Sequence, residues 1–177
     1  MQSELINQSE LLRRFAVLDG EQNPAGGSVN AILAHRDQYD TSYAAYYVPW
    51  LQITPKNQNV YIPPSGHMAG IYAGTDSSRG VWKAPANVVV QSITGLKTYI
   101  VKGEQDILNP VGVNAIRRFD TLGTRVWGAR TLSSDSSLIY ISVRRTLNFL
   151  AASIDQVRNG WCSSRTRSTP GTGSKIA

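Results

Sequence analysis

Residues 113 to 135 read VNAIRRFDTLGTRVWGARTLSSD, and this stretch predicts two strands joined by a turn. The runs 113–119 and 125–129 are rich in β-branched and aromatic residues, which favour strands. Gly123 lies between the runs and can adopt the backbone conformations that a tight turn requires. We therefore place a pair of adjacent strands here and work outward from it.

The clearest predicted helix follows this pair, at residues 138–156. Its apolar residues recur at i, i+4, i+7 and i+11, which places them on one face of a helix. They are Val143, Leu147, Leu150 and Ile154. Arg144, Arg145 and Asn148 lie on the other side.

Helices and strands also alternate before residue 113. We predict helices at residues 3–14, at residues 28–35 with Ser28 as the cap, and in a short segment that Ser65 caps. Met68, Ile71 and Tyr72 share one side of that last helix. The predicted strands are 15–19, 43–53, a run that ends at Pro63, and 88–93. Pro49 inside the run 43–53 indicates an edge strand or a bulge.

This alternation predicts an α/β fold, with a mixed sheet and flanking helices in a single domain. The chain has 177 residues, of which 41% are hydrophobic and 17% charged, the balance of a globular domain with a core. No apolar run approaches the ~20 residues that a membrane span needs. The first 14 residues carry acidic and polar groups where a signal peptide is apolar, so we expect a cytoplasmic product, at least when it is made.

The positive charge belongs to the end of the chain. The net charge is +6, from 18 basic and 12 acidic residues. Four basic residues follow Gln156 and no acid does, which leaves +2 for residues 1–156. We therefore divide the chain into a domain at 1–156 and an irregular basic tail at 157–177.

Catalytic and metal chemistry have little support in the sequence. Ser65, His67 and Asp76 lie near one another, but the G-x-S-x-G motif of a hydrolase is absent, so a helix cap and a buried or interfacial histidine explain them better. His35 and His67 have no ligand partner at metal-binding spacing. Cys162 is the single cysteine, which excludes an internal disulfide. We predict no catalytic residue, no cofactor and no metal.

The run from Gly70 to Gly80 is rich in glycine but lacks the phosphate-loop pattern G-x-x-x-x-G-K-[ST]. We expect these glycines to allow a tight reversal of the chain.

A basic group surrounds one tryptophan in the predicted strand pair. It consists of Arg117, Arg118, Arg125, Trp127 and Arg130. Arginine and tryptophan are enriched at the energetic centres of protein interfaces, so we predict a subunit interface here. The alternative is a nucleic-acid-binding module that uses this group and the basic tail. With residues 1–156 near neutral, nucleic acid is not the partner that we expect.

Several runs resemble, in the family's own order, the core domain of contractile tail sheath proteins. The family includes the sheaths of contractile-tailed phages, R-type bacteriocins and related injection machines. The similar runs are YDTSYAAYYVPW at 39–50, PPSGHMAGIYAGTDSSRGVWKAPAN at 63–87, GEQDILNP at 103–110, RVWGARTLSSD at 125–135 and VRR at 143–145.

The resemblance implies a structural, non-catalytic subunit. Such subunits form a helical lattice around a tube, and the lattice contracts to drive the tube through a target envelope. The implied partners are other sheath subunits, the tail tube protein and baseplate proteins. The implied location is the virion, with the host cytoplasm during assembly. Neighbours in this family exchange terminal arms as added strands.

Both ends of the chain depart from this family, whose members are usually more than twice as long. Read one base back from Gln156, suitable synonymous codons give GTQWVVFEPNTLDTWDRIK, which is similar to the sheath continuation. We therefore expect a truncated form, with residues 157–177 produced by a frameshift; a divergent tail is the alternative. A truncated core would expose apolar surface, so we also expect the isolated chain to self-associate.

Overall fold

A computed structural model describes residues 1–22 and 29–165, and from residue 159 onward it describes the backbone alone. The first sheet has the strand order β1-β2-β6-β7. Its strands are β1 (Ala16–Asp19), β2 (Ala44–Val48), β6 (Val113–Phe119) and β7 (Gly123–Trp127). β1 and β6 each run parallel to β2, whereas β7 runs antiparallel to β6. The predicted mixed sheet is therefore confirmed.

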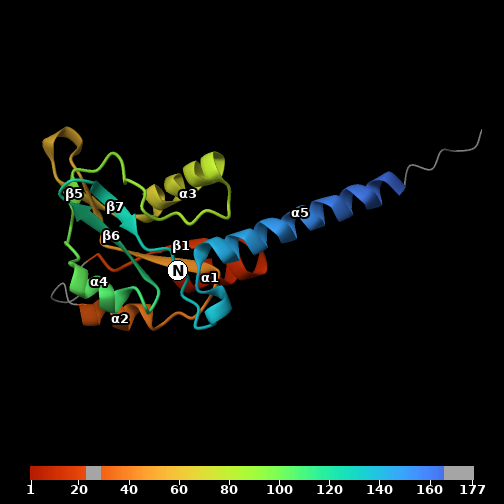
Figure 1. The fold of residues 1–177 in the computed structure, drawn as a ribbon, viewed down its shortest axis with the longest axis horizontal. Coiled ribbons are helices and arrows are strands. Elements are labelled where there is room, and N and C mark those ends of the chain that lie inside the picture. The colour runs from red at the N-terminus through yellow and green to blue at the C-terminus, as the bar shows by residue number, and fades with distance from the viewer. Residues whose placement is uncertain (23–28, 166–177) are drawn as a thin grey trace, which may run out of the picture.

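Helices cover both faces of this sheet (Figure 1). The helices are α1 (Gln2–Leu11), α2 (Val29–Arg36), α3 (Ser65–Arg79), α4 (Lys102–Leu108) and α5 (Ile141–Arg165). Side chains from α1, α2 and α4 pack on one face, and side chains from α3 and the start of α5 pack on the other. The predicted flanking helices are therefore present, in a three-layer arrangement.

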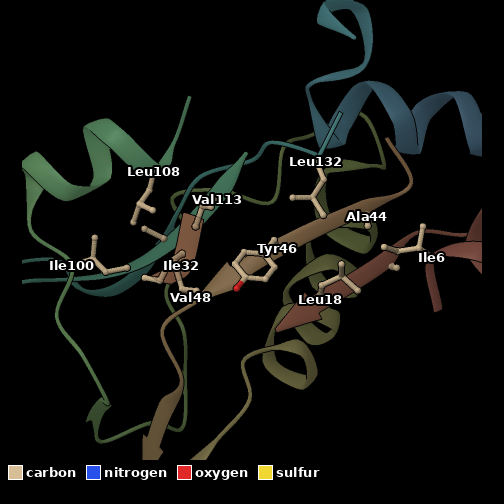
Figure 2. Packing of buried hydrophobic residues seen from close by; sticks show 12 residues of the cluster. Ile6, Leu18, Ile32, Ala44, Tyr46, Val48, Ile100, Leu108, Val113 and Leu132 are labelled. Carbon is tan, nitrogen blue, oxygen red and sulfur yellow. The ribbon is translucent and has the colours of Figure 1, made fainter. Parts of the chain in front are cut away.

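Strand β2 lies inside the sheet, between β1 and β6, and contributes to both cores. All of its residues are buried. Successive side chains of a strand point to opposite faces. Tyr46 accordingly packs in the first core, among side chains that include Ile6 and Leu108, as Figure 2 shows. Tyr47 packs in the second core, with Met68 among its neighbours.

The predicted strand 43–53 is two strands. The chain leaves the first sheet after Val48, passes through a cis peptide bond to Pro49, and enters a second sheet as β3 (Leu51–Ile53). This small antiparallel sheet has the order β4-β3-β5, with β4 at Val60–Ile62 and β5 at Gly95–Leu96. Proline has no N–H to donate to a ladder, so the strand divides there. The prediction of an edge strand was wrong for β2, which lies inside its sheet.

Helix α3 is longer than predicted and starts differently. Its N-cap is Pro64, and no side chain of the cap residue bonds the first turn. The Asp19 carboxylate at the end of β1 accepts the Ser65 N–H instead, at 2.7 Å. The prediction that Ser65 caps this helix was therefore wrong; a carboxylate from another element, Asp19, bonds the first turn. Within the glycine run, Gly70 and Gly74 lie inside the helix and do not reverse the chain, whereas Gly80, with φ +95°, ends the helix.

Two other segments differ from the prediction. Residues 88–93 do not form a strand; Val88 and Val90 bond the open edge of β7 through Val126 and Thr124. A short 3-10 turn occupies Pro55–Asn57. A second 3-10 turn at Ser136–Leu138 takes the start of the predicted helix 138–156, so α5 begins only at Ile141. α5 then continues through Arg165, within the segment predicted to be irregular. Residues 166–177 of the predicted tail, and Ser28 with its predicted cap, lie outside the described residues.

Candidate assembly interface

The β6-β7 hairpin carries most of the predicted basic group. Its register places Arg117 opposite Arg125, and Ala115 opposite Trp127. Directly opposed residues point to the same side of an antiparallel pair. The side chains of Arg117, Arg125 and Trp127 therefore share one face of the sheet.

The structure does not bring the other two arginines to this face. Arg118 pairs with Thr124 and, being next to Arg117 in a strand, points to the opposite face, where it is exposed. Arg130 follows the end of β7, and its guanidinium lies 5.8 Å from the ring centroid of Tyr140. Its backbone is fixed by the buried Asn114, whose Oδ1 accepts the Arg130 N–H at 2.7 Å. The predicted five-residue group is thus divided among three places.

Neighbouring residues hold the shared face in shape. Arg117 donates to Oε1 of Gln105 on α4 at 2.7 Å and to the Ile100 carbonyl at 3.2 Å. Arg125 donates to the carbonyl and the side-chain oxygen of Asn87, both at 3.0 Å. These contacts leave the two cations partly exposed but fix their positions.

Trp127 is the aromatic centre of this face. Its ring lies 4.8 Å from that of Phe119, between centroids, and Phe119 also receives the Arg117 guanidinium at 5.1 Å. Shallow hollows lie beside the indole, and Gln105 and Asn109 line them. We call Arg117, Phe119, Arg125 and Trp127 the Trp127 surface. A partly exposed aromatic ring flanked by fixed arginines and bordered by hollows has the features of an interface anchor.

Phe119, Gln105 and Asn87 were absent from the predicted site. The two-residue period of a strand places Phe119 beside Arg117, so that signal was present in the sequence. No local signal links Gln105 or Asn87 to the hairpin, because those contacts depend on how α4 and the segment after Pro85 pack.

The residues of the possible hydrolase triad do not come together. Asp76 is held by Arg145 of α5 in a two-point ion pair. It lies nine positions after His67 on α3, about 13 Å along a helix axis. Ser65 is bonded to Asp19, and burial raises the pKa of that carboxyl although these hydrogen bonds lower it. Ser65 and Asp76 therefore have separate structural partners, and Asp76 lies too far along α3 to orient His67.

Neither histidine lies in a cluster of metal-binding side chains within the described ranges 1–22 and 29–158. His35 bonds the Tyr46 hydroxyl through Nδ1 at 2.7 Å. His67 lines a wide groove between α3 and residues 83–92, together with Gly70, Gly74 and Lys83. The glycines of the glycine-rich run thus form part of the groove wall.

The partly buried ion pair between Arg145 and Asp76 borders two buried tyrosines between β2, α3 and α5. The hydroxyls of Tyr47 and Tyr72 are 2.8 Å apart, and the Arg145 guanidinium lies 4.7 Å from the Tyr72 ring centroid. Burial raises the pKa of both phenols above the ordinary value, so both stay protonated at neutral pH.

Comparison with known proteins gives this fold a family. Residues 1–132 match the family model described as the phage tail sheath protein central domain. This chain belongs to the phage tail sheath family. A putative prophage major tail sheath protein of Pseudomonas aeruginosa (strain UCBPP-PA14) is 30% identical over 154 residues, which cover 82% of this chain and 38% of that protein. The tail sheath protein of Escherichia phage P2 is 29% identical over 111 residues, 59% of this chain and 27% of its own length.

Solved sheath structures share the fold. The sheath complex of the extracellular contractile injection system PVC, in its contracted state, matches with a TM-score of 0.73 and 37% identity, over 89% of this chain and 43% of that one. The contracted helical sheath of the anti-feeding prophage matches with a TM-score of 0.66 and 28% identity, over 90% of this chain and 49% of its own. This sheath-family chain therefore spans less than half the length of these relatives.

Among the described residues, no helix meets the length and hydropathy needed to cross a bilayer.

Proposed function

We propose that this chain is a structural, non-catalytic subunit of a contractile sheath, which polymerises around a tail tube and shortens to drive the tube through a target envelope. The observation that supports this most directly is the likeness to the contracted PVC sheath over 89% of the chain. The partners are other sheath subunits, the tube protein and the baseplate. The location is the phage or phage-like particle, after assembly in the host cytoplasm.

We further propose that the Trp127 surface contacts a neighbouring subunit or the tube. Interface hot spots combine a fixed aromatic side chain with arginine in a pocket that excludes water. Trp127 packs at a tilt against Phe119, and the Arg117 guanidinium lies over the Phe119 ring, which supports this proposal.

The test is co-assembly of the tagged 177-residue chain with a longer sheath relative. The two proteins are expressed together with the relative's tube and baseplate, and particles are collected by ultracentrifugation. We expect the tag in the particle fraction, and electron microscopy should show sheath in that fraction. If intact particles form and the tag stays in the supernatant, the proposed role is wrong.

Two variants test the surface within that assay. Trp127→Ala should lower incorporation at least tenfold, which corresponds to the loss of a hot-spot residue. Arg118→Ala is the matched control, because Arg118 belongs to the same hairpin but points to the opposite face. Equal incorporation of both variants would remove the Trp127 surface as the contact. Thermal melting confirms that both variants fold.

The alternative, nucleic-acid binding by the basic group and the basic tail, has a different signature. It predicts saturable DNA binding that weakens steeply as salt increases. Hydrogen bonds already hold Arg117 and Arg125 against Gln105 and Asn87, which reduces their freedom to follow a phosphate backbone. An anisotropy titration with duplex DNA at two salt concentrations separates the two functions.

A further inference from the structure

Helix α5 presents its apolar face away from the protein. The exposed fractions are 39% for Val143, 45% for Leu147, 50% for Leu150, 67% for Ile154 and 71% for Val157. We call these five residues the α5 stripe. The sequence pattern of its first four members is typical of a helix face packed on a core. Here the face is uncovered and its exposure increases along the helix.

The contacts that hold α5 to the body come from the opposite side of the helix. Arg144 lies over the ring of Tyr43, and Arg145 pairs with Asp76. Further along, Asn148 donates to the Arg14 carbonyl at 3.3 Å, and Asp155 pairs with Arg13 at 3.2 Å.

At 3.6 residues per turn, Arg144, Arg145, Asn148 and Asp155 cluster on one side and the α5 stripe lies on the other. Beyond Ile141, which is buried in the second core, the helix therefore turns polar groups toward the protein and apolar groups toward solvent, the reverse of an ordinary surface helix. Figure 1 shows α5 extending beyond the layers that flank the sheet.

The spacing of the stripe is compatible with a second helix as its partner. Val143, Leu147, Leu150, Ile154 and Val157 are separated by four, three, four and three residues. This is the alternating spacing of positions a and d in a heptad repeat, which packs against a second helix as a coiled coil.

The flanks of the stripe favour an identical helix as the partner. Thr146, Ala151 and Ser153 border the stripe, and all three are small and uncharged. Two copies can therefore approach closely without bringing like charges together at these positions. Arg144 and Arg145 are occupied on the body side, and the exposed Arg158 pairs with Asp155 of its own helix at 3.3 Å.

The available area fits a weak, reversible pairing. At the exposures given, the stripe presents on the order of 450 Å² per chain, so a pair buries about 900 Å² before its flanks are included, close to the lower limit for a specific interface. We infer that the α5 stripe is a self-association site, on which the α5 helix of a second copy of this chain packs as a short coiled coil. This inference is independent of the Trp127 surface and of whether the chain enters a sheath.

The experiment is sedimentation velocity of the complete 177-residue chain over a concentration series up to several hundred micromolar. We expect a monomer at low concentration and a dimer at high concentration. Leu150→Glu, in the middle of the stripe, should weaken the dimer at least tenfold, because it places a carboxylate in an apolar seam. Ala152→Glu is the matched control; its exposed position lies half a turn from the stripe, and its dimer should be unchanged.

Each outcome decides the matter. A wild-type chain that stays monomeric throughout the series overturns the inference, as does a dimer that Leu150→Glu and Ala152→Glu affect equally. Circular dichroism shows whether Leu150→Glu keeps the native helix content. If that variant is unfolded, Ile154→Glu replaces it, because Ile154 is 67% exposed and farther from the body. The co-assembly assay requires a longer sheath relative and this one does not, so the two proposals can fail separately.

Discussion

Two glycines, Gly112 and Gly123, both have a left-handed backbone but differ in how closely neighbouring atoms surround them. Gly112 has φ +87° and Gly123 has φ +73°. A Cβ added at Gly112 would lie 2.4 Å from the Thr131 carbonyl oxygen, whereas one at Gly123 would meet nothing within 4 Å. The first position requires glycine for both conformation and space, the second for conformation alone.

Alanine at these two positions should therefore cost different amounts of stability. Gly123→Ala should lower the unfolding free energy by about 1 kcal/mol, because alanine is strained in the left-handed conformation. Gly112→Ala must also move the backbone of residue 131, so we expect a loss of about 3 kcal/mol. Urea denaturation of the two variants measures the difference. Losses of the same size would show that the backbone at Thr131 can move away from the added Cβ without a cost in stability.

The separation of the predicted basic group was itself predictable from the alternation of side chains along a strand. Arg117 and Arg118 are adjacent in the chain, yet the alternation of side chains along β6 places them on opposite faces. That separation was predictable once residues 113–119 were assigned to a strand. The partners of Arg117 were not, because Gln105 and Ile100 reach it only through the packing of α4.

Between elements, polar contacts fix the base of α5 against α3. The side chains of Arg145 and Asp76 are 14% and 28% exposed, and Arg145 also lies over the Tyr72 ring. Arg158 and Asp155 form a second ion pair on the same helix, but their side chains are 71% and 45% exposed. The helix thus contains a mostly buried pair and a solvated one.

Removing one arginine from each pair should distinguish them. Arg145→Met leaves the Asp76 carboxylate partly buried and without its cation, and we expect a loss of about 2 kcal/mol, less than for a fully buried pair. Arg158→Met should change stability by less than about 0.5 kcal/mol because water screens that pair. Thermal and urea unfolding of both variants test this. A loss for Arg158→Met as large as that for Arg145→Met would contradict the ranking by burial.

The elements themselves were predictable to different degrees. The hairpin, β1, α1 and the α/β class follow from local pattern, and the structure confirms them. The division of 43–53 into β2 and β3 was missed although Pro49 marks it, because both halves are apolar. α4 was missed because residues 102–108 contain few apolar positions from which a period can be read. The face of α5 was identified, but its exposure depends on what α5 packs against, which periodicity does not reveal.

For the whole molecule, one strand joins the two cores. Tyr46 packs in one core and Tyr47 in the other, so neither core can open while the other keeps β2 in place. By contrast, the second half of α5 touches the body through few side chains, among them Asp155. A domain built in this way should unfold cooperatively while the end of α5 frays independently.

Hydrogen exchange should resolve both behaviours in one experiment. At low protein concentration, amides of β2 and β6 should exchange only through global unfolding. Amides of α5 beyond residue 150 should exchange much faster, because a short helix without tertiary packing is marginal in water. Raising the concentration should slow exchange in α5 alone, since packing by a second copy protects that helix without changing the sheet. Protection in α5 equal to that of β2 at low concentration would mean that the helix is stable without a partner, and would remove fraying as the consequence of its uncovered face.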